Sequence, residues 1–290
     1  MTNESKKYLV LDGGFATELE RLSNQSLKTD LWSAQLLHSD PKSIAKLHQI
    51  YYEAGADIAT TCSYQASIEG FKKAGIDNPA ELIQLSVELA RGRIVAGSIG
   101  SFGALLADGS EYTGNFGVGL QELVQSHSER VETLLSGKYK PDLILFETIP
   151  SLLEIKAVIQ VAKTISIPVW LSMQCKENTI ASGESIEECV ALLNESNIEC
   201  IGVNCVNPLI VAPVLQRIRS LTSKRIMCYP NGGGEWDAMN KVWIGNEDFE
   251  EFKDLVRQWA ASGATVIGGC CHTGPKHIQI IKKVLDELNK

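Results

Sequence analysis

The sequence predicts an α/β fold, a single-domain (β/α)8 TIM barrel in which eight parallel strands alternate with eight helices. Eight short apolar runs, rich in β-branched residues, recur along the 290 residues. Most of these runs are continuously apolar, which is typical of parallel strands covered on both faces. The helical stretches between them are long enough for right-handed crossovers. An open, doubly wound sheet has the same alternation and stays the alternative, because one sequence does not reveal strand order.

The expected strands and helices follow one another regularly along the chain. The strands are expected at residues 8–12, 57–61, 94–99, 143–147, 168–173, 200–204, 225–229 and 265–269. The helices are expected at residues 41–55, 79–91, 120–136, 151–164, 185–196, 208–221, 246–262 and 275–289. The longest irregular stretch is 101–119, and a loop of this length is usually functional. No linker or break in composition appears, so we expect one barrel domain over residues 1–290.

Composition and charge exclude several classes of protein. Of all residues, 44% are hydrophobic and 21% are charged, an ordinary globular balance, and the net charge is -8. No basic stripe is present, so we expect no nucleic-acid partner. The polar N-terminus lacks a signal sequence, and no apolar stretch approaches the ~20 residues of a membrane span. We therefore expect a cytoplasmic protein whose eight cysteines are mostly reduced thiols.

The sharpest chemical signal is the pair Cys270 and Cys271 after the eighth strand, where barrel enzymes carry their chemistry. Adjacent residues point to opposite sides of a strand, so both thiols face one metal only if the backbone turns. We expect Gly268 and Gly269 to supply the freedom for that turn. Cys205, at the end of the sixth strand, is the best placed third donor. Three thiolates with one open position are typical of a catalytic zinc site, and sulfur ligands favour zinc or Cu(I).

Other interpretations of these residues stay open. A thiol cluster can also store or sense metals, or act as a redox pair, without being an enzyme. A phosphate-binding lyase or aldolase is a further alternative, with Lys176 forming a Schiff base and the glycines of 231–234 near the phosphate. The remaining thiols are expected to be small buried apolar side chains, and they are Cys62, Cys175, Cys189, Cys200 and Cys228.

Two further segments indicate a ligand with polar head groups. Glu147 ends an apolar strand and is therefore partly desolvated, so it needs a partner, either a ligand ammonium group or a neighbouring Arg or Lys. The run from Asp12 through two glycines to Thr17 follows the first strand and enters a helical stretch. Backbone N–H groups at such a turn bind a carboxylate or phosphate, although glycine turns without a ligand are common.

Taken together, these motifs resemble the homocysteine S-methyltransferase family. The matching motifs are Asp12-Gly13-Gly14, Glu147-Thr148-Ile149-Pro150, Val203-Asn204-Cys205 and Gly268-Gly269-Cys270-Cys271, with further matches at 31–34, 64–67 and 229–231. The resemblance implies a barrel that binds zinc through Cys205, Cys270 and Cys271, with the sulfur of homocysteine as fourth ligand. It also implies that Glu147 binds the homocysteine amino group with Asp12 nearby. By the same resemblance the carboxylate is taken by the backbone at Gly14, Phe15, Ala16 and Thr17, and Asn231 approaches zinc when substrate is absent.

The resemblance also indicates the methyl donor. Residues 107–114 resemble the members of the family that use a sulfonium donor, and they lie in the long 101–119 loop. This chain is too short to carry folate and cobalamin domains beside the barrel. We therefore expect S-methylmethionine as the donor, with S-adenosylmethionine as a lesser donor, and the 101–119 loop as a lid on the donor side. The helical outer faces carry no signal of an oligomeric state.

Overall fold

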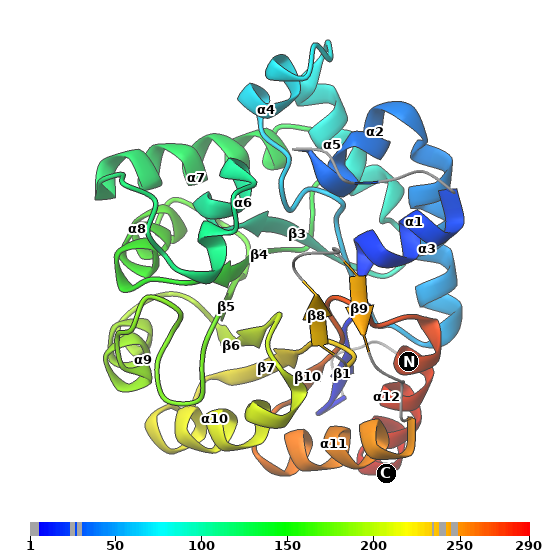
Figure 1. Ribbon diagram of the computed structural model, residues 1–290, viewed down its shortest axis with the longest axis vertical. Helices are drawn as coiled ribbons and strands as arrows, with labels where there is room; N and C mark the ends of the chain where they lie inside the picture. The colour runs from blue at the N-terminus through cyan, green and yellow to red at the C-terminus, as the bar shows by residue number, and fades with distance from the viewer. Residues whose placement is uncertain (1–5, 24–26, 28–30, 234, 238–241, 245–248) are drawn as a thin grey trace.

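A computed structural model describes residues 6–23, 27, 31–233, 235–237, 242–244 and 249–290. Eight parallel strands form one sheet in the order β1-β10-β7-β6-β5-β4-β3-β2. The strands at the two ends of this order, β1 and β2, also contact each other. Leu11 and Ile58 form a parallel bridge, and the N–H of Asp57 donates to the carbonyl of Val10 at 2.8 Å. The ring is thereby closed, so the barrel is confirmed and the open sheet is excluded (Figure 1). The strands are β1 (Leu9–Val10), β2 (Ile58–Thr60), β3 (Ile94–Gly100), β4 (Leu143–Ile149), β5 (Val169–Met173), β6 (Cys200–Asn204), β7 (Arg225–Tyr229) and β10 (Val266–Ile267).

The eight expected helices surround the ring of strands (Figure 1). They are α3 (Pro41–Ala54), α5 (Pro79–Leu89), α7 (Leu120–Leu135), α8 (Leu152–Ala162), α9 (Ile186–Asn194), α10 (Pro208–Leu221), α11 (Phe249–Ala261) and α12 (Pro275–Leu288). Local signals fix their ends: Ser185 and Glu188 form a capping box at the start of α9, and Gly55 ends α3 with a φ of 112°. The expected start of the seventh helix, at 246–248, lies outside the described residues.

The barrel interior is apolar toward the amino ends of the strands and polar at their carboxyl ends. Side chains alternate along a strand, so residues two apart point to the same side. Leu143 and Leu145 of β4 pack inside the barrel, and the next inward position is Glu147. On the other strands, the inward position nearest the carboxyl end is also polar. Together these side chains form a polar layer at one end of the barrel, namely Thr60, Ser98, Glu147, Ser172, Asn204 and Tyr229.

Several short elements depart from the expected pattern. The 101–119 stretch, expected to be irregular, contains helix α6 (Phe102–Leu106) and the 3-10 turn η3 (Ser110–Tyr112). After β7, strands β8 (Glu235–Asp237) and β9 (Val242–Ile244) form an antiparallel pair that the sequence did not predict. The other additions are α1 (Phe15–Ser23), η2 (Trp32–Gln35), α2 (Leu36–Ser39) and α4 (Ile68–Lys73). Among the described residues, every helix is too short or too polar to traverse a lipid bilayer.

The two ends of the barrel chain are tied together. The N–H of Tyr8, just before β1, donates to the side-chain oxygen of Asn289 at 3.0 Å, and the amide of Asn289 donates back to the Tyr8 carbonyl at 3.2 Å. Helix α12, which ends just before Asn289, packs against β1 in the same region (Figure 1). Because Tyr8 precedes the first strand, this junction lies at the end of the barrel opposite the polar layer.

Candidate active site with a metal-binding thiol cluster

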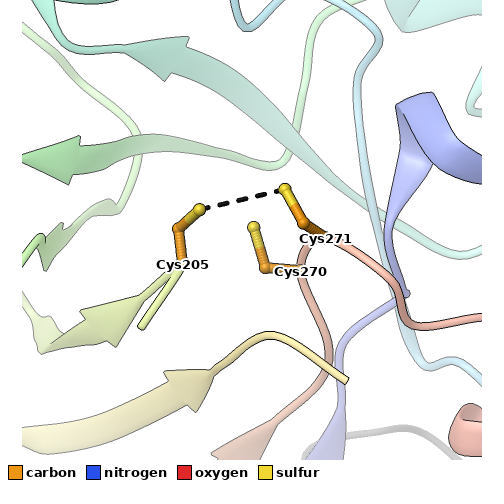
Figure 2. Close-up of side chains that lie close together, drawn as sticks. All are labelled: Cys205, Cys270 and Cys271. Atoms are coloured by element: carbon orange, nitrogen blue, oxygen red, sulfur yellow. Dashed lines mark hydrogen bonds between the residues drawn. The ribbon is translucent and has the colours of Figure 1, made fainter. Parts of the chain in front are cut away.

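Three cysteine thiols converge at the polar end of the barrel (Figure 2). The sulfur atoms of Cys205, Cys270 and Cys271 all lie within 4.8 Å of one another, and those of Cys205 and Cys271 are 3.9 Å apart. Zinc bound tetrahedrally to sulfur at about 2.3 Å holds its ligand sulfurs roughly 3.8 Å apart. The spacing and the soft donor set therefore fit a zinc-sized metal ion with three protein ligands.

Unusual backbone conformations orient the cluster. Cys205 follows β6 with a φ of 54°, and His272 follows Cys271 with a φ of 59°. Non-glycine residues adopt this left-handed region rarely, and such strain concentrates at functional sites. Thr148, directly after Glu147, shares it with a φ of 61°. Three segments around the same mouth therefore carry local backbone strain.

The expected role of the two glycines before the cysteine pair was wrong. Neither Gly268 nor Gly269 adopts a positive φ, so the turn does not depend on their conformational freedom. A Cβ on Gly268 would lie 2.6 Å from the Leu11 Cβ, and one on Gly269 would lie 2.2 Å from the Thr273 hydroxyl. These glycines instead permit close packing against β1 and the loop behind the site.

A cavity of about 90 Å³ opens beside the thiols. It is lined by residues that the sequence singled out, namely Asp12, Gly14, Phe15, Ala16, Thr17, Glu147, Cys205, Cys270 and Cys271. Four aromatic residues that had no assigned role also line it, namely Trp32, Tyr64, Tyr112 and Tyr229. Their signal was present in the sequence, because they lie in the stretches 31–34, 64–67, 107–114 and 229–231 that match the family. Asn231 is not among the lining residues.

Two buried carboxyl groups face this cavity. Asp12 accepts hydrogen bonds from the backbone N–H of Thr60 at 2.8 Å and from its hydroxyl, yet burial raises the pKa of Asp12 to about 8. Glu147 accepts hydrogen bonds from the hydroxyls of Ser98 and Tyr229, and burial raises its pKa to about 7. The negative charge of Glu147 further raises the pKa of Asp12, so a bound cation would favour the ionised form of both carboxyls.

The amino end of α1 also faces the cavity. Its first N–H groups lack partners within the helix, which makes this end suited to an anion. Thr17 adds a hydroxyl oxygen that is buried without a hydrogen-bond partner in the described part of the chain. The N–H of Gly14, however, donates to the carbonyl of Thr273 at 2.9 Å. The N–H groups of Phe15, Ala16 and Thr17 are therefore better placed than that of Gly14 to bind a carboxylate.

The electrostatics of the thiols favour a cation. Hydrogen bonds from Cys270 and Cys271, and further ones from Tyr112 and Asn231, hold the pKa of Cys205 well below its usual range. The same contacts raise the pKa of Cys270 and Cys271, so the three thiols do not ionise together unaided. Within the described structure, the Asn231 side-chain oxygen is buried without a hydrogen-bond partner.

The other candidates from the sequence lie elsewhere. Cys175, Cys189, Cys200 and Cys228 are buried, and burial raises the pKa of each thiol, as expected for apolar packing. Cys62 is also buried but lines the cavity, where its thiol donates to the Ser33 carbonyl at 3.3 Å. Lys176 is exposed and does not line the cavity, which argues against a Schiff-base enzyme at this site.

Comparison with known proteins identifies the family. The sequence model of the homocysteine S-methyltransferase family matches residues 9–285. The chain belongs to this family. It is 41% identical to homocysteine S-methyltransferase 1 of Arabidopsis thaliana, over 95% of this chain and 93% of the relative. It is 38% identical to a selenocysteine Se-methyltransferase of Brassica oleracea var. italica, over 98% of this chain and 91% of that one.

A solved structure agrees with this assignment. The homocysteine methyltransferase MmuM of Escherichia coli, in its metallated form, superposes with a TM-score of 0.85 at 34% sequence identity, covering 97% of both chains. The protein is therefore an S-methyltransferase with a (β/α)8 barrel, and its thiol cluster is a candidate metal site.

Proposed function

We propose that this homocysteine S-methyltransferase moves a methyl group from S-methylmethionine, and less readily from S-adenosylmethionine, to homocysteine bound at a zinc site. The observation that carries the proposal is one cavity that joins three convergent thiols, two buried carboxyl groups and the amino end of a helix. A thiol amino acid offers a matching set of groups: a sulfur, an ammonium and a carboxylate.

The acceptor pose follows from these complementary charges. Asp12 and Glu147 receive the ammonium group, whose positive charge favours the ionised form of both carboxyls. The first turn of α1, with Thr17, receives the carboxylate. Cys205, Cys270 and Cys271 would hold zinc, which would supply the positive charge that lowers the pKa of a thiol and so favours the homocysteine thiolate at neutral pH. The proton of the thiol leaves to solvent.

Methyl transfer then requires only alignment and a dry site. The acceptor sulfur forms a bond to the donor methyl carbon, while the bond from that carbon to the sulfonium sulfur breaks and its electron pair stays on the leaving thioether. Opposite charges on the two sulfurs disappear together, so exclusion of water favours the reaction. Trp32, Tyr64 and Tyr112 line the cavity, and aromatic rings attract a cationic donor. With S-methylmethionine, donor and acceptor both become methionine.

The free thiols indicate where the protein works. All eight cysteines are unpaired, including the vicinal pair Cys270 and Cys271. Thiols of this kind persist in a reducing compartment. We therefore propose a cytoplasmic location, in which the cluster stays available for metal.

A direct assay tests this function. Purified protein is incubated with homocysteine and with either S-methylmethionine or S-adenosylmethionine, and methionine is quantified together with bound metal by elemental analysis. We expect about one zinc per chain and faster turnover with S-methylmethionine. A preparation that contains zinc but makes no methionine from either donor would refute the proposed reaction, and faster turnover with S-adenosylmethionine would refute the donor preference.

A further inference from the structure

A third carboxylate adjoins Tyr112, a residue that lines the cavity and contacts Cys205, and it lies on a different element from Asp12 and Glu147. Glu111 belongs to η3, the 3-10 turn in the 101–119 segment, and it is half-buried. Its Oε2 atom is buried without a hydrogen-bond partner in the described part of the chain. The negative charges that act on this carboxylate come from Cys205 and Asp108, and no described basic side chain forms an ion pair with it.

The turn that carries Glu111 is held firmly against the mouth of the barrel. The N–H of Ser110 donates to Asp108 at 2.9 Å, and the hydroxyl of Tyr112 lies 3.4 Å from the sulfur of Cys205. On the other side, Gly103 packs so closely that a Cβ there would lie 2.4 Å from the Glu111 nitrogen. The turn therefore holds Glu111 directly beside Tyr112, which lines the cavity, although Glu111 itself is not a lining residue. Its negative charge and that of Cys205 repel each other, and it also acts on the cavity-lining Tyr64.

An unpaired carboxylate close to anionic sulfurs is unfavourable unless a cation forms an ion pair with it. The acceptor ammonium is already matched by Asp12 and Glu147, which come from the β1 and β4 ends. Both sulfonium donors bring a second amino-acid head group with its own ammonium. We propose that Glu111 binds the α-ammonium group of the sulfonium donor and thereby selects donors that are amino acids, an inference that rests on the proposed function.

The ammonium is the better partner for chemical reasons. The positive charge of the sulfonium disappears during transfer, so a carboxylate paired to it would stabilise the reactant more than the transition state and slow the reaction. The ammonium keeps its charge throughout, so Glu111 stabilises donor and transition state equally. Such uniform binding lowers KM for the donor and leaves kcat unchanged.

A cycle of one protein change and one ligand change tests the contact. The holoenzyme and Glu111→Gln are assayed at saturating homocysteine with S-methylmethionine and with 4-(dimethylsulfonio)butanoate, the same donor without its amino group. The analogue is measured as a substrate or, if turnover is slow, as a competitive inhibitor. We expect the KM for S-methylmethionine to rise about tenfold in the variant, as for one charge-assisted hydrogen bond, with kcat and the KM for homocysteine unchanged. The KM of the analogue, or its inhibition constant, should be the same in the wild type and in Glu111→Gln.

Controls separate this contact from general effects. Glu122→Gln makes the same chemical change at an exposed position in the first turn of α7 and should leave all constants unchanged. Equal losses for both donors in Glu111→Gln, or no loss for S-methylmethionine, would overturn the inference. A wild-type enzyme that fails with both sulfonium amino acids would instead overturn the proposed function, and the inference with it.

Discussion

Replacing Glu147 with Gln should stabilise the ligand-free protein and weaken homocysteine binding at the same time. Burial raises the pKa of Glu147 from 4.5 to about 7 in the folded chain. A raised pKa stabilises the fold fully below the unfolded value and loses that contribution as the pH rises through the folded value. The full loss corresponds to about 3 kcal/mol, of which about 2 kcal/mol falls between pH 5 and pH 8. The amide variant does not titrate, so its relative stability should grow across this range.

The binding effect has the opposite sign. Glu147 faces the cavity and accepts hydrogen bonds from Ser98 and Tyr229, which orient it for a ligand ammonium. Removing its charge forfeits a hydrogen bond between charged groups, about 1.5–3 kcal/mol, or roughly 10- to 150-fold in affinity for homocysteine. Asp12 remains as a second carboxyl in the same cavity, so the lower end of this range is expected.

Two measurements decide the matter. Urea unfolding of wild type and variant at pH 5 and pH 8, without homocysteine, gives the stability difference, and isothermal titration gives the affinity. Glu132→Gln makes the same change on the exposed face of α7 and serves as control. A Glu147→Gln protein that is less stable at pH 8 and binds homocysteine normally would refute the reasoning, because that pattern belongs to a purely structural carboxylate.

Two further changes test the thiol cluster and the close packing behind it. Cys271→Ala should lose bound metal in elemental analysis, whereas Cys189→Ala, a buried thiol away from the cavity, should keep it; full metal in the first variant would contradict the cluster as a ligand set. Gly14→Ala would place a Cβ 2.3 Å from the carbonyl of Cys270 and should lower the free energy of unfolding by about 1–3 kcal/mol, while Gly119→Ala, with open space around it, should not. Equal melting temperatures for the two glycine variants would disprove the crowding.

The architecture of this protein was readable because its strands are buried on both faces. Continuous apolar runs mark such strands, and the eight runs overlap the eight barrel strands, with ends that differ by a few residues. The breaks in those runs were equally informative. Glu147 and Cys205 interrupt apolar patterns at strand ends, and the closed barrel brings these ends around one mouth, where both line the same cavity.

The parts that escaped sequence reasoning are short or depend on distant neighbours. Elements such as α6, η3 and the β8–β9 pair are too brief to establish a period. The left-handed backbone at Cys205 is imposed by surrounding packing and has no local signature, since cysteine does not favour it. Glu111 lies in the 107–114 stretch that matches the family but received no role of its own, because nothing in the sequence reveals that its neighbour Tyr112 reaches the Cys205 sulfur.

The reciprocal hydrogen bonds between Tyr8 and Asn289 have a practical consequence for handling the enzyme. They hold the first strand and the last helix together at the base of the barrel, away from the thiols. An affinity tag or surface tether attached at either end of the chain would therefore present the open mouth outward, toward substrate. A circularly permuted enzyme, joined across this base by a short linker and opened at an outer loop, should keep its catalytic end undisturbed.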